Sequence, residues 1–209
     1  MEAPGSNAEA LRGYYRLHAG VYDLTRWAFL FGRRTLVAEA SRRIDPPARI
    51  LEIGCGTGKN LAALARAFPK AHLVGLDLSA EMLGRAKAKL APYGDRVELL
   101  HRPYAQPLSE TDGGEGFGLV VVSYALSMMN PGYGQVLAHC RRDLGEGGVL
   151  AVADFHDTRH EWFRRWMGVN HVRMEGHLLA ALESECEPLL RRIGRGYGGL
   201  WEYFVYLGR

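Results

Sequence analysis

Short apolar runs alternate with segments of helical periodicity along most of this chain. Apolar, partly β-branched runs of about four to eight residues predict strands, whereas apolar positions recurring every three or four residues predict helices. The predicted strands are residues 50–53, 71–78, 96–100, 117–124 and 149–155, followed by a hairpin of two strands over residues 191–208. The predicted helices are residues 9–40, a segment opening at Asn60, and residues 79–90, 132–144, 159–167 and 174–186.

The order of these elements predicts a parallel sheet, because strands that alternate with helices form βαβ units. Residues 117–124, F-G-L-V-V-V-S-Y, are typical of a central strand buried on both faces. The sequence Asp45-Pro46-Pro47 interrupts the helical pattern before the first strand. We therefore expect an N-terminal helical lid over residues 1–45, which is part of the same domain as the sheet-forming residues 46–209.

The composition limits the class of protein. With 209 residues, of which 47% are hydrophobic, the chain is expected to form one domain with a substantial core. The formal charge of +3 is too small for a dedicated nucleic-acid-binding protein but is compatible with an anionic membrane surface. Cys55, Cys140 and Cys186 form no C-x-x-C pair, which disfavours a disulfide scaffold or structural zinc and fits the cytoplasm. Neither a signal peptide nor an apolar run of the about 20 residues needed for a membrane span is apparent.

The stretch 49–60, R-I-L-E-I-G-C-G-T-G-K-N, predicts a strand, a ligand-binding loop and a helix. Glycine at every second position allows a sharp turn and close backbone approach to a ligand, and the following helix directs free N–H groups at it. The spacing fits neither a phosphate-binding P-loop nor the dinucleotide pattern G-x-G-x-x-G. The next predicted strand ends in Asp77, at the distance expected for an acid that binds a ribose. The alternative is a core strand that ends in an acid by chance.

The motif E-x-G-x-G-x-G and Asp77 resemble those of class I S-adenosylmethionine-dependent methyltransferases, and five blocks in the same order extend the resemblance over nearly the whole chain. This resemblance implies a Rossmann-like three-layer α/β sandwich with a seven-stranded, mostly parallel sheet. It also implies S-adenosyl-L-methionine as cofactor and S-adenosyl-L-homocysteine as product.

Several further stretches look like the bacterial methyltransferases of betaine-lipid synthesis. They are Y-Y-R-L-H-A-G-V-Y-D-L-T-R, G-T-G-K-N, V-S-Y-A-L-S-M-M, and V-A-D-F-H-D with W-F-R-R-W. This likeness implies N-methylation of diacylglyceryl-homoserine to the trimethyl betaine lipid at the inner membrane surface. Two alternatives remain: N-methylation of phosphatidylethanolamine or a soluble amine, and cofactor binding without catalysis.

The resemblance also implies which residues bind the cofactor. The glycine loop holds its methionine part, Asp77 its ribose, and Leu78 and Met82 flank its adenine. Residues 101–106, H-R-P-Y-A-Q, depart from the Gly-Asp-Ala that many relatives carry there, so the adenine is expected on Tyr104 and near Ala105, with Gln106 as a substitute acceptor. The full expected set is Tyr22, Arg26, Glu52, Gly54, Cys55, Gly56, Thr57, Gly58, Asn60, Asp77, Leu78, Met82, Tyr104, Ala105, Ser123 and Tyr124.

Methyl transfer to an amine requires alignment and exclusion of water more than a strong base. The faces of aromatic rings stabilise a cationic centre, and no general base stands out. The expected catalytic residues are Tyr15, Tyr22 and Tyr124, and the expected acceptor-binding residues are Tyr14, Tyr15, Arg33, Met128 and His156. For Tyr14 and Tyr15 the alternative is core packing, for Tyr22 and Arg26 an ordinary packed helix face, and for Arg33 a solvated helix end.

The predicted helix 159–167 combines aromatic and basic residues, as interfacial helices do. Trp162, Phe163, Trp166 and Met167 are expected on one side, with Arg159, Arg164 and Arg165 around it. The alternative is a helix that packs its aromatic side on the sheet. Asp154, His156, Asp157 and His160 lie close in sequence, but a strand end followed by a surface turn has the same composition, so no metal site is expected.

Overall fold

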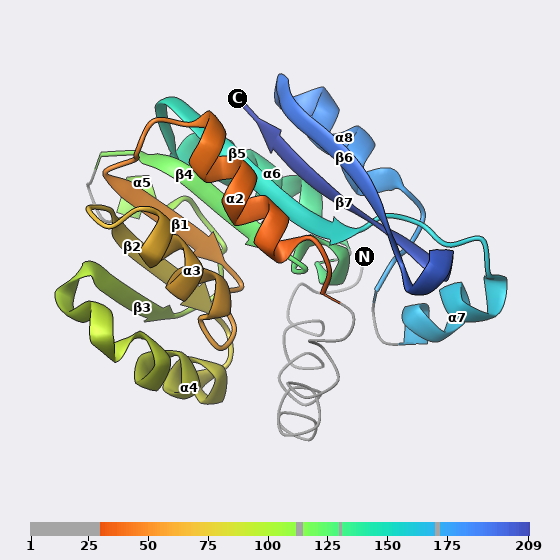
Figure 1. Ribbon diagram of the computed structural model, residues 1–209, viewed down its shortest axis with the longest axis horizontal. Coiled ribbons are helices and arrows are strands. Elements are labelled where there is room, and N and C mark those ends of the chain that lie inside the picture. The colour runs from red at the N-terminus through yellow and green to blue at the C-terminus, as the bar shows by residue number, and fades with distance from the viewer. Residues whose placement is uncertain (1–29, 112–114, 130, 170–171) are drawn as a thin grey trace.

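The computed structural model describes residues 30–111, 115–129, 131–169 and 172–209. In this part of the chain a seven-stranded sheet has the order β3-β2-β1-β4-β5-β7-β6 (Figure 1). Neighbouring strands from β3 to β5 are parallel, and β7 is antiparallel to both β5 and β6. The mostly parallel seven-stranded sheet predicted from the sequence is therefore confirmed. The strands are β1 (Arg49–Ile53), β2 (His72–Asp77), β3 (Val97–His101), β4 (Phe117–Ser123), β5 (Leu144–Phe155), β6 (Pro188–Gly196) and β7 (Trp201–Gly208).

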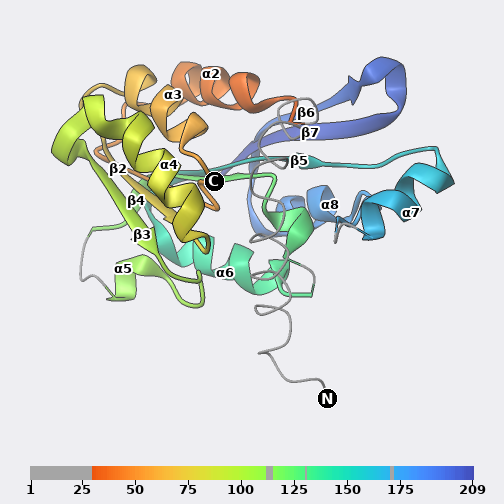
Figure 2. The ribbon, with the colours of Figure 1, turned by 90° about the horizontal axis from the view of Figure 1, so that it is seen from below.

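Helices cover both faces of this sheet and complete three layers (Figures 1 and 2). One core lies between the sheet and α2, α3 and α4, and the other lies between the sheet and α5, α6 and α8. The α-helices are α2 (Arg33–Arg43), α3 (Lys59–Ala67), α4 (Ala80–Leu90), α5 (Leu108–Thr111), α6 (Tyr133–Asp143), α7 (Glu161–Val169) and α8 (His177–Glu185). The 3-10 helices are η1 (Ala91–Arg96), η2 (Leu126–Met128) and η3 (Tyr197–Gly199).

The central strand β4 divides its side chains between the two cores. Leu119 and Val121 belong to one core, whereas Val120 and Val122 belong to the other. All four are at most 1% exposed, because successive side chains of a strand point to opposite faces. The carboxyl ends of β1, β2 and β4 thereby come together at one edge of the sheet, with the loops that follow them.

Strand β5 begins five residues earlier than the sequence pattern predicts. The sequence pattern leaves residues 145–148 between the predicted helix 132–144 and the predicted strand 149–155, but this stretch belongs to β5, which starts at Leu144 and has a register shift between Phe117 and Leu119 of β4. A Cβ atom at Gly148 would lie 2.8 Å from the carbonyl oxygen of Phe117. The glycines therefore allow a close backbone approach rather than ending the strand.

The described part of the N-terminal region begins at residue 30. Of the predicted helix 9–40, only its last part is described, as α2, and Leu36, Val37 and Ala40 of this helix are buried in the core. Tyr14, Tyr15, Tyr22 and Arg26 lie outside the described residues. The division into a lid over residues 1–45 and a sheet domain over residues 46–209 stays a prediction.

Candidate active site

A cavity lies at the carboxyl ends of β1, β2 and β4, where open α/β sheets bind their ligands. It is formed by the glycine loop after β1, the end of β2, the turn after β4 and the start of α2. Its lining residues are Leu30, Arg33, Ile53, Gly54, Cys55, Gly56, Thr57, Lys59, Asn60, Leu76, Asp77, Leu78, Met82, Tyr104, Ser123, Tyr124, Ala125, Met128, Met129 and Pro131.

The glycine loop has the conformation that its spacing predicts. Gly54, Gly56 and Gly58 all have positive φ angles, of 68°, 55° and 71°. A Cβ atom at Gly58 would lie 2.8 Å from a methyl carbon of Leu90, whereas one at Gly56 would meet no atom within 4 Å. Gly58 thus lets α3 pack closely on α4, and Gly56 leaves bare backbone at the cavity.

Asp77 connects the end of β2 to this loop. One of its carboxylate oxygens accepts a hydrogen bond from the Gly56 N–H at 2.8 Å, and the other accepts one from the Ser79 N–H at 2.9 Å. Each carboxylate oxygen can accept more than one hydrogen bond. Because Asp77 also lines the cavity, it can order the loop and bind a pair of vicinal hydroxyl groups at the same time.

Glu52 is a buried carboxyl group beneath the loop. Its Oε1 atom accepts a hydrogen bond from the Asn60 side-chain amide at 2.8 Å, and its Oε2 atom has no hydrogen-bond partner among the described residues. Burial raises the pKa of Glu52 to about 7, although the bond from Asn60 and the charge of Arg33 act in the opposite direction. Buried oxygens of this kind are usually satisfied, so an ammonium group or a water molecule held in the cavity would complete this site.

The apolar end of the cavity is formed by Leu78, Met82 and Tyr104. The Tyr104 hydroxyl donates a 2.5 Å hydrogen bond to the buried carboxylate of Asp143, which fixes the ring. Burial, reinforced by nearby Cys140 and Asp143, raises the pKa of Tyr104 far above its usual value, so the phenol stays protonated. This wall suits a flat apolar group such as an adenine ring.

Arg33, Ser123 and Tyr124 form a second group of lining residues, which we call the acceptor end of the cavity. The Arg33 Nε atom donates to the Ser123 hydroxyl at 3.2 Å, and the guanidinium lies 5.9 Å from the centre of the Tyr124 ring. Tyr124 is only 2% exposed and donates from its hydroxyl to the Phe31 carbonyl at 2.6 Å. Its φ angle of 55° lies in the left-handed region, which costs a non-glycine residue about 1–2 kcal/mol. Such strain concentrates at functional sites, and here it holds an aromatic ring against the cavity.

The structure brings most of the predicted site residues together. The described residues of the predicted set that line the cavity are Arg33, Gly54, Cys55, Gly56, Thr57, Asn60, Asp77, Leu78, Met82, Tyr104, Ser123, Tyr124 and Met128. Glu52 and Gly58 do not line the cavity. Glu52 lies beneath the loop and accepts the hydrogen bond of Asn60, and Gly58 belongs to the loop itself. Seven further lining residues were not predicted: Leu30, Ile53, Lys59, Leu76, Ala125, Met129 and Pro131. Of these, Lys59 belongs to the motif G-T-G-K-N, and Ala125 and Met129 belong to V-S-Y-A-L-S-M-M.

Of the described residues, three further candidates named in the sequence analysis do not line this cavity. Ala105 is exposed and, like its neighbour Gln106, does not line it. His156 does not line it either; its ring packs edge-on against Phe204 and lies next to Gly176. Among the described residues, no group of three or more His, Cys, Asp or Glu side chains is placed to hold a metal ion.

Comparisons with known proteins agree with this geometry. Residues 50–148 match the model of a family described as a methyltransferase domain. The chain is 33% identical over 156 residues to the trans-aconitate 2-methyltransferase of Deinococcus radiodurans, which covers 73% of this chain and 52% of that protein. It is 32% identical over 123 residues to the malonyl-[acyl-carrier protein] O-methyltransferase of Anoxybacillus flavithermus, covering 57% of this chain and 44% of that protein. The chain spans about half the length of these curated relatives.

Two solved structures show the same fold. The Burkholderia thailandensis 1,6-didemethyltoxoflavin-N1-methyltransferase, with bound S-adenosylhomocysteine, has a TM-score of 0.75 and 20% sequence identity and covers 100% of this chain and 91% of that chain. The N-methyltransferase NodS of Bradyrhizobium japonicum has a TM-score of 0.68 and 20% identity and covers 85% of this chain and 93% of that chain. The α/β Rossmann-like methyltransferase fold predicted from the sequence is therefore confirmed.

Proposed function

We propose that this protein is an S-adenosylmethionine-dependent N-methyltransferase that acts on the amine of diacylglyceryl-homoserine. Residues 50–148 match the family model of a methyltransferase domain, and the fold is shared with a solved methyltransferase that has S-adenosylhomocysteine bound. The betaine lipid is its proposed product, and the cytoplasmic membrane surface is its proposed place of action. The observation that carries the proposal is that the cavity lining combines the Arg33 guanidinium, 5.9 Å from the centre of the Tyr124 ring, with apolar side chains that include Leu30, Met128 and Met129. This combination suits a carboxylate attached to an apolar molecule.

The residues present fit the cofactor. Bare backbone at Gly56 and the carboxylate of Asp77 suit the ribose and the chain next to it, and Leu78, Met82 and Tyr104 suit the adenine. The Oε2 atom of Glu52, which has no hydrogen-bond partner in the described part of the chain, suits an ammonium group. When bound, S-adenosylmethionine supplies a methyl group on a positively charged sulfur.

The protein's own groups then hold and orient the acceptor. Arg33 pairs with the acceptor carboxylate, because a guanidinium matches a carboxylate in charge and geometry. The Tyr124 ring lies against the amine, where its face favours the positive charge that nitrogen acquires by about 0.5–2 kcal/mol. Before each transfer the nitrogen must be neutral, and its proton passes to bulk water. The predicted contributions of Tyr14, Tyr15, Tyr22 and Arg26 stay part of this proposal, as do those of Ala105 and His156.

Methylation of a carboxylate is a second candidate function. Curated relatives are named as methyltransferases of trans-aconitate and of malonyl-[acyl-carrier protein], and Arg33 would also hold a di- or tricarboxylic acid. The two candidates differ in the bond formed, because a methyl ester releases methanol in base whereas an N-methyl group does not.

The test uses purified protein and S-adenosylmethionine labelled in the methyl carbon. Diacylglyceryl-homoserine, phosphatidylethanolamine, a soluble amine and trans-aconitate are offered in parallel, and products are separated by thin-layer chromatography. Base-stable label in a betaine-lipid spot is the expected result. Base-labile label on trans-aconitate favours the second candidate, label only on the other amines replaces the proposed acceptor, and cofactor binding without any transfer contradicts enzymatic function.

A further inference from the structure

Helix α7 exposes an apolar stripe that the core does not use. Trp162, Trp166 and Val169 follow one another at positions i, i+4 and i+7, so they share one side of the helix. They are 63%, 50% and 80% exposed. Phe163 and Met167, on the other side, are buried in the core. The sequence pattern placed all four of the helix's Trp, Phe and Met side chains together, but the structure separates two packed residues from two exposed tryptophans.

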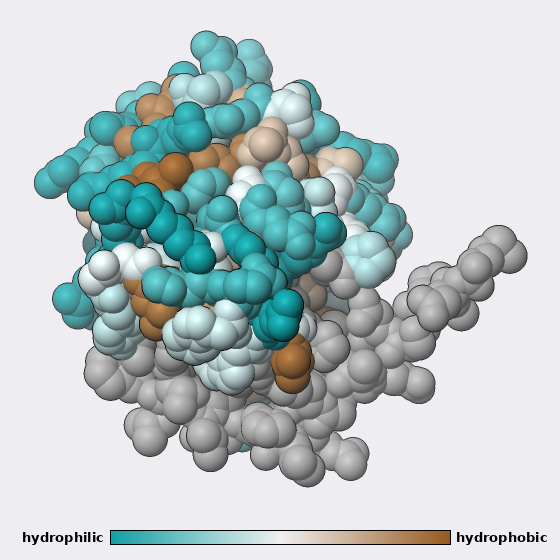
Figure 3. Space-filling model, turned by 90° about the vertical axis from the view of Figure 1, so that its right-hand side faces the viewer, coloured by the Kyte–Doolittle hydropathy of each residue, from teal (hydrophilic) through white to brown (hydrophobic). Residues whose placement is uncertain are grey.

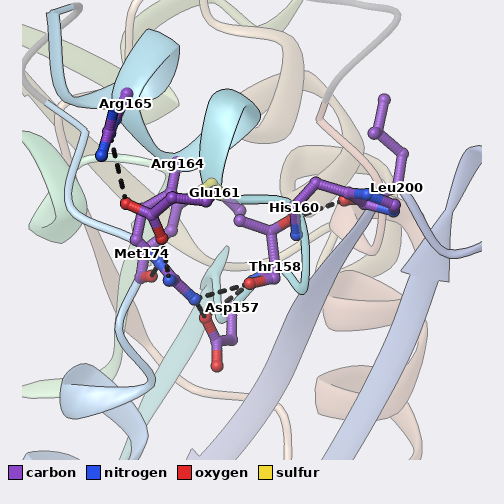
Figure 4. Close-up of polar contacts among 8 residues, drawn as sticks. All are labelled: Asp157, Thr158, His160, Glu161, Arg164, Arg165, Met174 and Leu200. Carbon is purple, nitrogen blue, oxygen red and sulfur yellow. Dashed lines mark hydrogen bonds and ion pairs between the residues drawn. The ribbon is translucent and has the colours of Figure 1, made fainter.

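The exposed stripe is held in a fixed position by the buried side of α7 and by Arg164 (Figure 4). The Phe163 ring stacks on Trp201 of β7, with ring centres 5.5 Å apart. Arg164 donates to the Asp157 carboxylate at 2.9 Å, to the Thr158 carbonyl at 2.6 Å and to the Met174 carbonyl at 3.1 Å. These bonds join α7 to the chain segments before and after it, so the tryptophans project from an anchored helix.

A polar cleft with basic groups lies next to the start of this stripe, where the ring centres of His160 and Trp162 are 6.4 Å apart. Arg159, His160 and Arg195 line this cleft between the start of α7 and the tip of the β6–β7 hairpin. Within the same cleft Glu202 pairs with Arg195 itself, and Asp157 pairs with Arg164 of α7. Arg165 of the same helix is 81% exposed and pairs with Glu161 at 3.5 Å. Figure 3 shows this side of the molecule, where hydrophobic and near-neutral residues interrupt a hydrophilic surface.

A series of aromatic contacts connects the stripe with the acceptor end of the cavity. Trp166 contacts Phe163 and Trp201 contacts Phe31, with ring centres 5.6 Å and 5.9 Å apart, and Phe163 stacks on Trp201 between them. The Phe31 carbonyl accepts the hydrogen bond of the cavity residue Tyr124. The exposed face of α7 therefore belongs to the packed unit that borders the acceptor end.

We propose that Trp162, Trp166 and Val169, with Arg159, His160 and Arg195, form a docking surface for an anionic lipid bilayer. Tryptophans settle at the level of lipid headgroups, and arginines bind the headgroup phosphates. The proposal rests on the lipid acceptor of the proposed function, because such an acceptor reaches the cavity from a membrane. It adds which face of the protein meets that membrane. Among the described residues no helix is long and apolar enough to cross a bilayer.

The test is co-sedimentation of the full chain with vesicles of phosphatidylcholine, with and without phosphatidylglycerol. The wild type is compared with two variants. The double variant Trp162→Ser/Trp166→Ser removes both tryptophans, whereas Val169→Asp leaves the ring contacts of Phe163 intact. Leu189→Ser is the matched control, since Leu189 is also exposed, by 36%, but starts β6 at the end away from the hairpin tip. We expect binding to the anionic vesicles to fall about tenfold or more in both α7 variants and to stay unchanged in the control.

Several outcomes overturn the docking surface. The proposal fails if the wild-type protein does not sediment with anionic vesicles. It also fails if the α7 variants sediment as well as the wild type. A change in molecular mass of the α7 variants in light scattering overturns it too, because it shows that a second copy covers the face. Each variant is also titrated with S-adenosylhomocysteine, and only variants with unchanged affinity enter the comparison.

A second readout separates this inference from the proposed function. Methyl transfer to diacylglyceryl-homoserine is measured in vesicles and in detergent micelles. Loss of transfer in vesicles, with transfer in micelles retained, supports the docking surface in the α7 variants. If the wild type methylates no homoserine lipid in either form but the vesicle binding follows the expected pattern, the acceptor is wrong and the docking surface stands.

Discussion

Replacing Glu52 by glutamine tests the link between burial, charge and cofactor binding. Burial raises the pKa of Glu52 from an ordinary 4.5 to about 7 in the folded protein. Glutamine keeps the shape and can still accept the hydrogen bond from Asn60, which is 2.8 Å long in the wild type. The substitution therefore removes the ionisation of this group with little change in packing.

The sign of the effect on stability follows from the direction of the pKa shift. Between about pH 4.5 and 7 the folded protein holds a proton on Glu52 that the unfolded chain releases, so stability falls as the pH rises through this window. A difference of this size corresponds to about 3 kcal/mol. In Glu52→Gln this contribution is absent, and above pH 7 we expect the variant without ligand to be up to about 3 kcal/mol more stable than the wild type.

Ligand binding is expected to have the opposite dependence on pH. An ammonium group beside Glu52 favours the ionised carboxylate, so the affinity of the wild type for S-adenosylhomocysteine should fall about tenfold per pH unit below pH 7. Glu52→Gln should bind more weakly at pH 8 and lack this slope. Calorimetric titrations from pH 5.5 to 8 and urea denaturation of the ligand-free protein measure both effects. Equal slopes in the wild type and Glu52→Gln, with the exposed Asp95→Asn as control, would refute the reasoning.

Three further substitutions test the packing around the site. Gly58→Ala places a Cβ atom 2.8 Å from Leu90 at a φ of 71° and should lower the free energy of unfolding, measured in urea, by about 1–3 kcal/mol. Its control Gly84→Ala meets no atom within 4 Å and should not destabilise α4. Equal effects of the two substitutions would contradict the strain at Gly58. Tyr104→Phe removes a hydrogen bond from buried Asp143 and should cost about 1–3 kcal/mol with the affinity for S-adenosylhomocysteine nearly unchanged; a variant as stable as the wild type would show that the bond contributes nothing. Arg164→Met should lower the melting temperature and leave that affinity unchanged, and a large loss of affinity would mean that α7 shapes the cofactor site.

Local features of the fold were predictable where short stretches of sequence determine them. The β-branched run of β4 and the alternating glycines after β1 each require one backbone conformation. The predicted helix 79–90 begins at Ser79, which caps α4: its hydroxyl accepts a hydrogen bond from the Met82 N–H at 3.3 Å. Asp77 could be placed because the end of a strand puts its side chain at the edge of the sheet.

Features that depend on contacts between distant residues were not predictable. The bond from Arg33 to Ser123 joins residues 90 positions apart. The positive φ of Tyr124 has no sequence signal, because it depends on the turn that β4 makes before η2. The separation of Trp162 from Phe163 on α7 likewise depends on Trp201, which the hairpin places beneath only one side of that helix.

The central claim is that the cavity at the edge of the sheet binds the S-adenosyl group. The most direct test is calorimetric titration of S-adenosylhomocysteine into the wild type and Asp77→Ala, with the exposed Asp95→Ala as control. Because a hydrogen bond to a charged group contributes about 1.5–3 kcal/mol, we expect the wild type and the control to bind equally and Asp77→Ala to bind about tenfold to a hundredfold more weakly. Equal affinity in all three proteins, or no binding by the wild type, would contradict this assignment.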